Sequence, residues 1–472
     1  MKDTRPNFIL IMTDQHRGDC LSLENHPVLL TPNIDHIGGQ GVHFTRAYST
    51  CPSCVPARRS LMVGQYPATH GMVGYHDGLE WTAPPTLPSV LKAAGYHTFL
   101  VGRNMHLWPR RQRYGFDEMV IFEDDYMEFL TNHQDNCPAG YWDHGISGNG
   151  WTARPWHLQE KFHPTTWTVT QALHFLKRRD PSCPFLLVVS FIAPHPPLVP
   201  PAFYLERYLR SQIPPPYLGD WAKPPERDGR GSHVQSYRVN LQGEALRAAR
   251  AGYYGLINHV DDQLYRLLGS HTGLKGDLAK NTYIIFTSDH GEMLGDHYLF
   301  RKAYPYEGSA RIPFLIQGPE VQPGQTCSCP VSLEDIMPTI LELAGIPIPE
   351  TVEGQSLAPI LRGKKKTLER EYLHGEHASC YSYPQANHFL TDGKEKYCWF
   401  TATGEEQLFN LQDDPGELHN LACRPEYQPR LLVWRERLIT KLKNRPEGFT
   451  DGERLIPGRP HQPLLPHASG KT

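Results

Sequence analysis

The sequence predicts an α/β fold: a large mixed sheet, mostly parallel, that is flanked by helices. Short apolar runs typical of buried strands alternate along the chain with stretches of helical character. The strand candidates are Phe8–Thr13, His97–Val101, Phe185–Phe191 and Thr282–Ser288. Helix candidates precede the last three, at Leu87–Gly95, Thr166–Lys177 and Glu244–Leu268. Parallel strands need a crossover connection, so this alternation favours a sheet that helices cover on both faces.

The texture of the sequence changes after the basic run Lys364–Lys366. Short mixed segments such as Tyr397–Phe400 and Gln407–Leu411 follow it, and they favour a smaller α+β subdomain. We therefore divide the chain into residues 1–370 and 371–472. The Pro-rich end, Ile456–Thr472, is expected to be loosely held.

Composition excludes two classes of partner. The chain has 472 residues, of which 39% are hydrophobic, enough for a sizeable core. A formal charge of −3 offers no basic surface for nucleic acid or an anionic membrane. The longest apolar runs, such as Phe185–Ala193, are about half as long as a membrane-spanning helix. We expect neither a nucleic acid nor a membrane partner.

The first residues predict a location. The apolar stretch Phe8–Met12 is too short for the hydrophobic region of a signal peptide, and no small-residue cleavage site follows it. We therefore expect a cytoplasmic protein. In that reducing compartment most of the ten cysteines would be free thiols.

Each strand candidate ends beside residues suited to catalysis or metal binding. They are Asp14 and Gln15, Asn104 and His106, His195, and Asp289 and His290. Ligands of open α/β sheets bind in the crevice outside the carboxyl ends of the strands, so we expect these side chains to form one site. Asp14, Gln15 and Asp289 offer oxygen donors, which suit Ca²⁺, Mg²⁺ or Mn²⁺ better than zinc, and the imidazole of His290 adds weight to Mn²⁺.

Cys51 and Cys54 form a C-x-x-C pair. Pro56 disfavours a redox motif at the start of a helix, and no second C-x-x-C or H-x-x-x-H pair completes a zinc site nearby. A buried thiol remains the simplest interpretation of an isolated cysteine. The polar surroundings and the predicted helix start at Ala57–Val63 favour a reactive Cys54 instead.

The segment Cys54-Val-Pro-Ala-Arg58 resembles the C-x-P-S/A-R signature of the sulfatase family, within the alkaline phosphatase superfamily. Other segments are similar to family segments in the same order, and the resemblance spans about residues 6 to 425. These segments are Pro6–Gln15, Thr31–Asp35, Thr287–Glu292, Arg301–Pro313 and Gln407–Gly416. The resemblance implies an alkaline-phosphatase-like fold and hydrolysis of sulfate esters, with residues 371–472 closing the substrate cleft.

The resemblance also implies roles for particular residues. A maturation enzyme would oxidise Cys54 to formylglycine (3-oxoalanine), whose hydrate attacks sulfur while Arg58 holds it. His195 or Lys302 would protonate the leaving alcohol, and His106 would deprotonate the remaining hydroxyl. One divalent cation, with Ca²⁺ as first choice, would be bound by Asp14, Gln15, Cys54, Asp289 and His290.

The sequence departs from the family after the second strand, where many sulfatases have Lys-x-His. Here the chain reads Gly102-Arg103-Asn104-Met105-His106. Either the Asn104 amide or the Arg103 guanidinium would then bind the substrate. Phosphonate monoester hydrolases of the same superfamily also lack this lysine, so hydrolysis of phosphonate monoesters or phosphodiesters is an alternative. A metal-binding scaffold with an unconverted Cys54 is a third.

Two further groups bear on the substrate. His374, Glu376 and His377 form a polar cluster with three interpretations: a substrate subsite, a second metal site, or packing at a domain seam. Tryptophans are frequent between the second and third strands; packing is the first interpretation, and lining of a cleft is the second. A sulfated saccharide or an aryl sulfate is the expected substrate, and the oligomeric state stays open.

Overall fold

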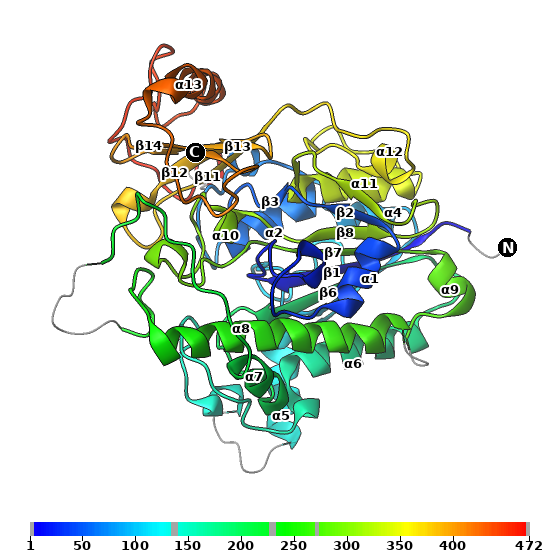
Figure 1. Cartoon of the computed structure of the whole chain (residues 1–472). Helices are drawn as coiled ribbons and strands as arrows, with labels where there is room; N and C mark the ends of the chain where they lie inside the picture. Colours follow the sequence, from blue (N-terminus) through cyan, green and yellow to red (C-terminus); the bar gives the residue numbers. More distant parts are fainter. Residues whose placement is uncertain (1–3, 134–139, 226–232, 270–272, 469–472) are drawn as a thin grey trace.

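The computed structural model describes residues 4–133, 140–225, 233–269 and 273–468 and confirms the α/β fold. A central eight-stranded sheet has the order β5-β4-β6-β1-β7-β8-β2-β9 (Figure 1). Its strands are β1 (Asn7–Asp14), β2 (Val42–Phe44), β4 (His97–Gly102), β5 (Glu118–Ile121), β6 (Phe185–Pro194), β7 (Thr282–Ser288), β8 (Phe314–Gln317) and β9 (Gln325–Cys327). All four predicted strands are present.

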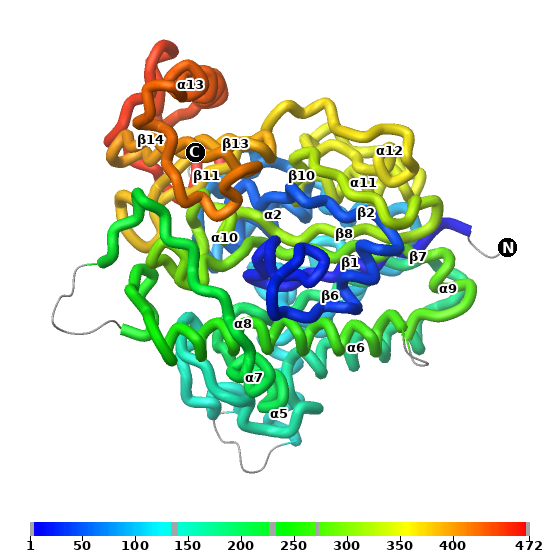
Figure 2. Tube along the Cα trace, viewed as in Figure 1, coloured from blue at the N-terminus to red at the C-terminus, as the bar shows by residue number. Residues whose placement is uncertain are grey.

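The first strand of the chain lies in the middle of the sheet. β1 pairs in parallel with β6 on one side and β7 on the other, and Figure 2 shows these three strands together. β4 and β5 extend the parallel part, whereas β8 runs antiparallel to both β7 and β2. The carboxyl ends of β4, β6, β1 and β7 are therefore neighbours on one edge.

Side chains on alternate positions of β1 point into two different cores. Ile9 and Ile11 belong to one buried cluster, to which four helices contribute. These helices are α1 (Pro32–Gly39), α6 (Pro164–Arg178), α7 (Ala202–Leu209) and α8 (Gly243–Leu264). The predicted periodic helix is α8, and a π-helical turn extends it over Tyr265–Gly269.

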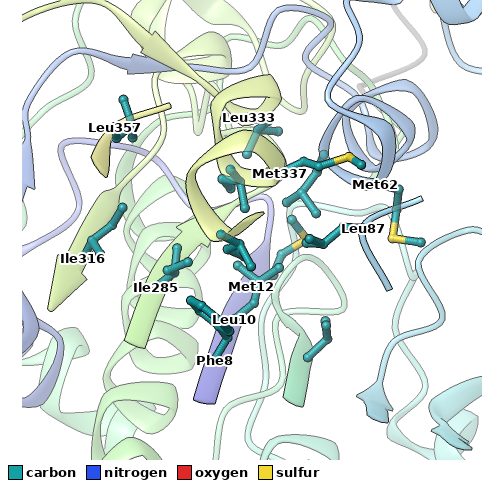
Figure 3. Close-up of a cluster of buried hydrophobic side chains, with 14 of the residues drawn as sticks. Phe8, Leu10, Met12, Met62, Leu87, Ile285, Ile316, Leu333, Met337 and Leu357 are labelled. Carbon is teal, nitrogen blue, oxygen red and sulfur yellow. The ribbon is translucent and has the colours of Figure 1, made fainter. Parts of the chain in front are cut away.

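Phe8, Leu10 and Met12 enter the second core on the opposite face (Figure 3). The helices that contribute to this core are α2 (Cys54–Val63), α4 (Leu87–Ala93), α11 (Ile336–Leu343) and α12 (Ala358–Leu361). Four further helices are α3 (Pro67–His70), α5 (Met127–His133), α9 (Gly276–Lys280) and α10 (Glu307–Ala310). Helices thus cover both faces, as the alternation of elements predicted.

A second sheet near the C-terminus is small and antiparallel. Its strands are β11 (Leu373–His377), β12 (Asn387–Thr391), β13 (Glu395–Phe400) and β14 (Glu406–Asn410), in that order. One face packs against the main body through Phe389 and Phe409, and helix α13 (Gln428–Leu442) covers the other. A two-stranded pair, β3 (Ala47–Tyr48) with β10 (Val331–Ser332), is separate.

The prediction of a loosely held tail is wrong for its described part. Val73 N–H donates to the Pro463 carbonyl at 2.9 Å, and Leu465 N–H donates to the Gly71 carbonyl at 2.8 Å. These bonds pair the tail with the residues that follow α3. The proline rings favour an extended backbone, and this extended segment forms backbone hydrogen bonds with residues 71 and 73.

Two of the tryptophans between β4 and β6 pack in a buried aromatic cluster. Trp156 and Trp167 are buried in a cluster with Phe122 and Tyr126, whereas Trp108 and Trp142 are exposed. Among the described helices, none is both long and apolar enough to cross a bilayer.

Candidate functional site

Four adjacent strands bring the predicted residues to one place. Asp14 is the last residue of β1, Arg103 follows β4, His195 follows β6, and Asp289 with His290 follows β7. Cys54 is the first residue of α2, so that helix begins three residues earlier than predicted. Its side chain is 1% exposed.

The two carboxylates of the site each divide their oxygens between two tasks. Asp14 Oδ2 accepts from Arg58 Nη2 at 2.9 Å, and Asp289 Oδ2 accepts from Arg58 Nε at 2.8 Å. The Oδ1 atoms face the other way: Asp14 Oδ1 lies 3.7 Å from Cys54 Sγ, and Asp289 Oδ1 lies 3.6 Å from His290 Nε2. All five side chains are completely buried or nearly so.

These Oδ1 atoms and their neighbours fit a divalent cation. Asp14, Cys54, Asp289 and His290 each offer one donor atom, and all four atoms lie within 4.8 Å of one another. His290 Nδ1 contacts the Gly291 carbonyl at 2.9 Å; a carbonyl only accepts, so Nδ1 holds the proton and Nε2 has a free lone pair. Two carboxylates beside one imidazole suit a hard ion with oxygen-rich coordination.

Cys54 Sγ is surrounded by polar groups. Lys302 Nζ and His290 Nε2 each lie 3.2 Å from the sulfur. Lys302 Nζ also donates to Gln15 Oε1 at 2.9 Å, which places the Gln15 side chain at the site. The Gln15 backbone has φ of 69°, a strained conformation for a residue other than glycine, and such strain is common where function requires a particular orientation.

The arginines set the charge of Asp14. Burial alone would raise the pKa of the Asp14 carboxyl, but Arg103 and Arg58 hold it well below its ordinary value. Burial would lower the pKa values of the Arg58 and Arg103 guanidinium groups, but the carboxylates of Asp14 and Asp289 raise them. Asp14 is therefore an anion throughout the neutral range.

Stability is expected to depend on Asp14 in a pH-dependent way. A carboxyl whose folded pKa is depressed stabilises the fold above its unfolded pKa, and this contribution is lost as the pH falls through the folded value. In chelator-treated protein, Asp14→Asn should lower the free energy of unfolding at pH 7 by about 3–5 kcal/mol. The difference from the parent should shrink steadily below about pH 4. Denaturant titrations at both pH values measure this, and a constant difference would contradict the assignment.

The segment after β4 separates the two alternatives that the sequence left open. Arg103 Nη1 donates to Asp14 Oδ2 at 2.6 Å, so the guanidinium is at the site. The Asn104 amide holds its own loop, with bonds to the Leu107 and Arg110 carbonyls of 3.2 and 3.1 Å. Gly102 makes this approach possible: its φ is 97°, and a Cβ there would lie 2.0 Å from the Ser190 carbonyl oxygen.

The two remaining histidines lie differently. His195 is 9% exposed and bonds the Pro196 carbonyl through Nδ1 at 2.6 Å. Burial and the nearby Lys302 ammonium lower the pKa of His195 well below its ordinary value, so the ring is neutral. His106 Nδ1 lies 3.8 Å from Asp77 Oδ1, and its Nε2 has no hydrogen-bond partner among the described residues.

His374, Glu376 and His377 do not act together. Successive side chains of a strand point to opposite faces of the sheet. His377 faces the main body, where its Nε2 contacts Ser53 Oγ at 2.7 Å, next to Cys54. His374 and Glu376 face the side that α13 covers, with Arg445 donating to Glu376 at 2.7 Å. His374 lines a cavity of about 510 Å³ with Tyr66, Arg370 and Lys441, and this cavity includes none of the residues around Cys54.

Several supporting residues were not identified from the sequence. Ser190 Oγ accepts from Arg58 Nη1 at 2.9 Å, and Glu292 accepts from the Gln15 amide. Glu292 lies in the Thr287–Glu292 segment, so its position beside Asp289 and His290 was a usable signal. Ser190 has no such signal, because it is one of many buried residues in β6.

Comparisons with known proteins show the family of the chain. Residues 6–346 match the family described as Sulfatase, and residues 295–444 match one described as N-sulphoglucosamine sulphohydrolase, C-terminal. An arylsulfatase of Clostridium perfringens is 40% identical, covering 97% of this chain and 98% of its own length. A choline-sulfatase of Rhizobium meliloti is 31% identical over 90% of this chain and 84% of its own. The solved phosphonate monoester hydrolase of Agrobacterium radiobacter is 25% identical with a TM-score of 0.77, covering 92% of this chain and 95% of that one.

Proposed function

The chain belongs to the sulfatase family and is a sulfate ester hydrolase, and we propose that Cys54, converted to formylglycine, provides its nucleophile. The observation that carries the proposal is the position of Cys54 Sγ, 3.2 Å from both Lys302 Nζ and His290 Nε2. An inert buried thiol would have apolar neighbours instead. Once converted by a maturation enzyme, residue 54 would supply a hydrated aldehyde as the nucleophile.

Asp14, Gln15, Asp289 and His290 would hold one divalent cation beside residue 54. We propose Ca²⁺ first and Mn²⁺ or Mg²⁺ as alternatives, since oxygen donors dominate the set. When bound, the ion would polarise the sulfuryl oxygens and lower the pKa of an oxygen nucleophile. Arg58 would keep both carboxylates in place, and Arg103 would add positive charge for the substrate anion. A cytoplasmic location remains part of the proposal.

Lys302 is the better candidate for protonating the leaving alcohol. His195 is neutral because of its lowered pKa, and its Nδ1 proton is committed to the Pro196 carbonyl, whereas the Lys302 ammonium has several protons to donate. Neutral His195 would instead orient the substrate or accept a proton. His106 would serve as the base that regenerates the aldehyde.

Lys302→Met is expected to show which leaving groups need a proton. Turnover of an alkyl or sugar sulfate should fall about 10²–10⁴-fold, because a poor leaving group requires an acid. Turnover of 4-nitrophenyl sulfate should fall much less, because nitrophenolate leaves without protonation. His195→Gln is the matched control and should affect both substrates alike. Equal losses on both substrates for Lys302→Met would remove Lys302 from this role.

We propose that the substrate is a small aryl or saccharide sulfate. The C. perfringens relative supports an aryl sulfate through its name, and the polar surroundings of Cys54 accept an anionic ester. Phosphonate monoester hydrolysis is the second candidate, supported by the Agrobacterium structure and by Arg103 in place of the lysine. Membership of an enzyme family disfavours the scaffold alternative.

The ratio of two kcat/KM values tests the substrate class. We expect 4-nitrophenyl sulfate to be hydrolysed with a higher kcat/KM than 4-nitrophenyl phenylphosphonate, with either Ca²⁺ or Mn²⁺ present. The choice between the metals then follows from which ion restores activity after chelation. A higher kcat/KM for the phosphonate with both metals would replace the first proposal by the second.

A further inference from the structure

A cluster of three histidines and one glutamate lies on the α13 side of the small sheet, apart from the site around Cys54. His374 and Glu376 are two residues apart on β11, so they share a face of that strand. His388 on β12 stands directly opposite Glu376 in the antiparallel register. The fourth member, His461, comes from the C-terminal tail. Three separate segments of chain therefore meet here.

The donor atoms of the cluster are close together. His374 Nε2 lies 3.1 Å from His388 Nδ1, and His461 Nε2 lies 3.4 Å from Glu376 Oε2. His388 Nδ1 is 4.0 Å from the same carboxylate oxygen. The donor atoms of His374, Glu376 and His388 all lie within 4.8 Å of one another. The rings of His374 and His461 both lie nearly parallel to the His388 ring, with centroids 5.2 and 5.0 Å away.

Hydrogen bonds within the described residues do not satisfy this cluster. His461 is 4% exposed, and neither of its ring nitrogens has a hydrogen-bond partner among those residues. Its Nε2 nevertheless points to within 3.4 Å of Glu376 Oε2. A buried polar atom without a partner is rare, and it calls for a ligand that the protein atoms do not supply.

The charges of the cluster favour a cation. Burial lowers the pKa of His374 to about 4 and holds that of His388 well below its ordinary value, so both imidazoles are neutral and keep a lone pair. Arg445 holds the pKa of Glu376 well below its ordinary value despite burial. The guanidinium also pairs with Glu447 at 2.6 Å, so two carboxylates face one arginine. Lys441 lies outside this pairing, over the ring of Tyr372.

We propose that His374, Glu376, His388 and His461 bind a structural zinc ion that fastens the C-terminal tail to the small sheet. Three imidazoles and one carboxylate are a donor set that zinc accepts in tetrahedral geometry. Arg445 Nη1 donates to both carboxylate oxygens of Glu376, at 2.7 and 2.8 Å, and Oε2 has a second lone pair for the ion. Trp399 and Phe449 pack against the His388 ring. The proposal does not depend on the reaction at Cys54.

Metal content and cobalt spectroscopy of the full chain test the proposal. The parent protein, stripped with a chelator and reloaded, should hold about one zinc ion per chain in addition to its Cys54-site metal. Loading with Co²⁺ should produce the intense visible absorption of a tetrahedral site. His461→Phe should lose that zinc equivalent and that absorption while retaining sulfatase activity. His419→Phe is the matched control, because His419 is exposed and pairs with Asp220, and it should retain both.

Two outcomes would overturn the proposal. Equal zinc content and equal cobalt spectra in the parent and His461→Phe would place the metal elsewhere. If the cobalt-loaded parent protein shows no tetrahedral absorption, the proposal is wrong whatever the variants show. If His461→Phe does not fold, the partly exposed His374→Gln replaces it, with the same expected loss.

Discussion

A Cys54→Ala variant is expected to lose sulfate ester turnover by at least about 10⁴-fold, with stability close to that of the parent. Removal of a nucleophile leaves substrate binding and the surrounding charges in place, but no group remains to attack sulfur. The measurement is kcat on an aryl sulfate together with a thermal unfolding curve. Mass analysis of the peptide that contains residue 54 in the parent should show an aldehyde in place of the thiol.

Cys51→Ala is the matched control for that experiment. Cys51 is as deeply buried as Cys54, and burial raises the pKa of its thiol well above the ordinary value, so it stays protonated and unreactive. We expect most of the activity to remain. Comparable losses from both variants would instead indicate a dithiol function for the C-x-x-C pair. An unmodified Cys54 thiol in active protein would contradict the formylglycine mechanism.

Arg58→Met should be strongly destabilising. The Arg58 guanidinium is completely buried and bonds Asp14, Asp289 and Ser190 at 2.8 to 2.9 Å. Its removal leaves two buried carboxylates without their shared partner, which costs about 3–5 kcal/mol of the free energy of unfolding. Denaturant titration measures this loss. The variant should also depend more strongly on added divalent cation than the parent does, because the ion would offset the unpaired charge.

Arg59→Met isolates the effect of the carboxylates from that of losing an arginine. Arg59 is also buried, but it contacts the Trp81 ring and donates to the Leu79 carbonyl at 3.1 Å. The expected loss is about 1–2 kcal/mol, from a cation–π contact and one hydrogen bond. If Arg58→Met and Arg59→Met lowered the free energy of unfolding equally, the ion pairs of Arg58 would not be the cause of its loss.

The strands and the polar residues at their ends were largely predictable, because both depend on short stretches of sequence. A run such as Phe8–Thr13 is buried on both faces of the sheet and so lacks polar interruptions, and Asp14 marks its end. The same holds for Thr282–Ser288 with Asp289 and His290. Since parallel neighbours end on one edge of the sheet, the strand ends alone predict that residues far apart in sequence form one site.

Other features depended on contacts that no local pattern contains. The choice between Arg103 and Asn104 follows from the turn at Gly102, which sends one side chain to Asp14 and the other into its own loop. His374 and His377 were grouped because they are close in sequence, yet strand alternation sends them to opposite faces. The tail looked unstructured because its prolines form no periodic pattern, and it is held by backbone bonds to residues 71 and 73.

By itself the sequence determined the fold class, the family resemblance and the residues that surround Cys54. These depend on short-range patterns: hydrophobic periodicity, strand ends and a five-residue segment. Only the tertiary structure decided which oxygen of Asp14 meets an arginine and which faces Cys54, and how His461 reaches the histidines of β11 and β12. Such pairings depend on the direction of side chains brought together from distant segments, and direction is a property of the packed fold.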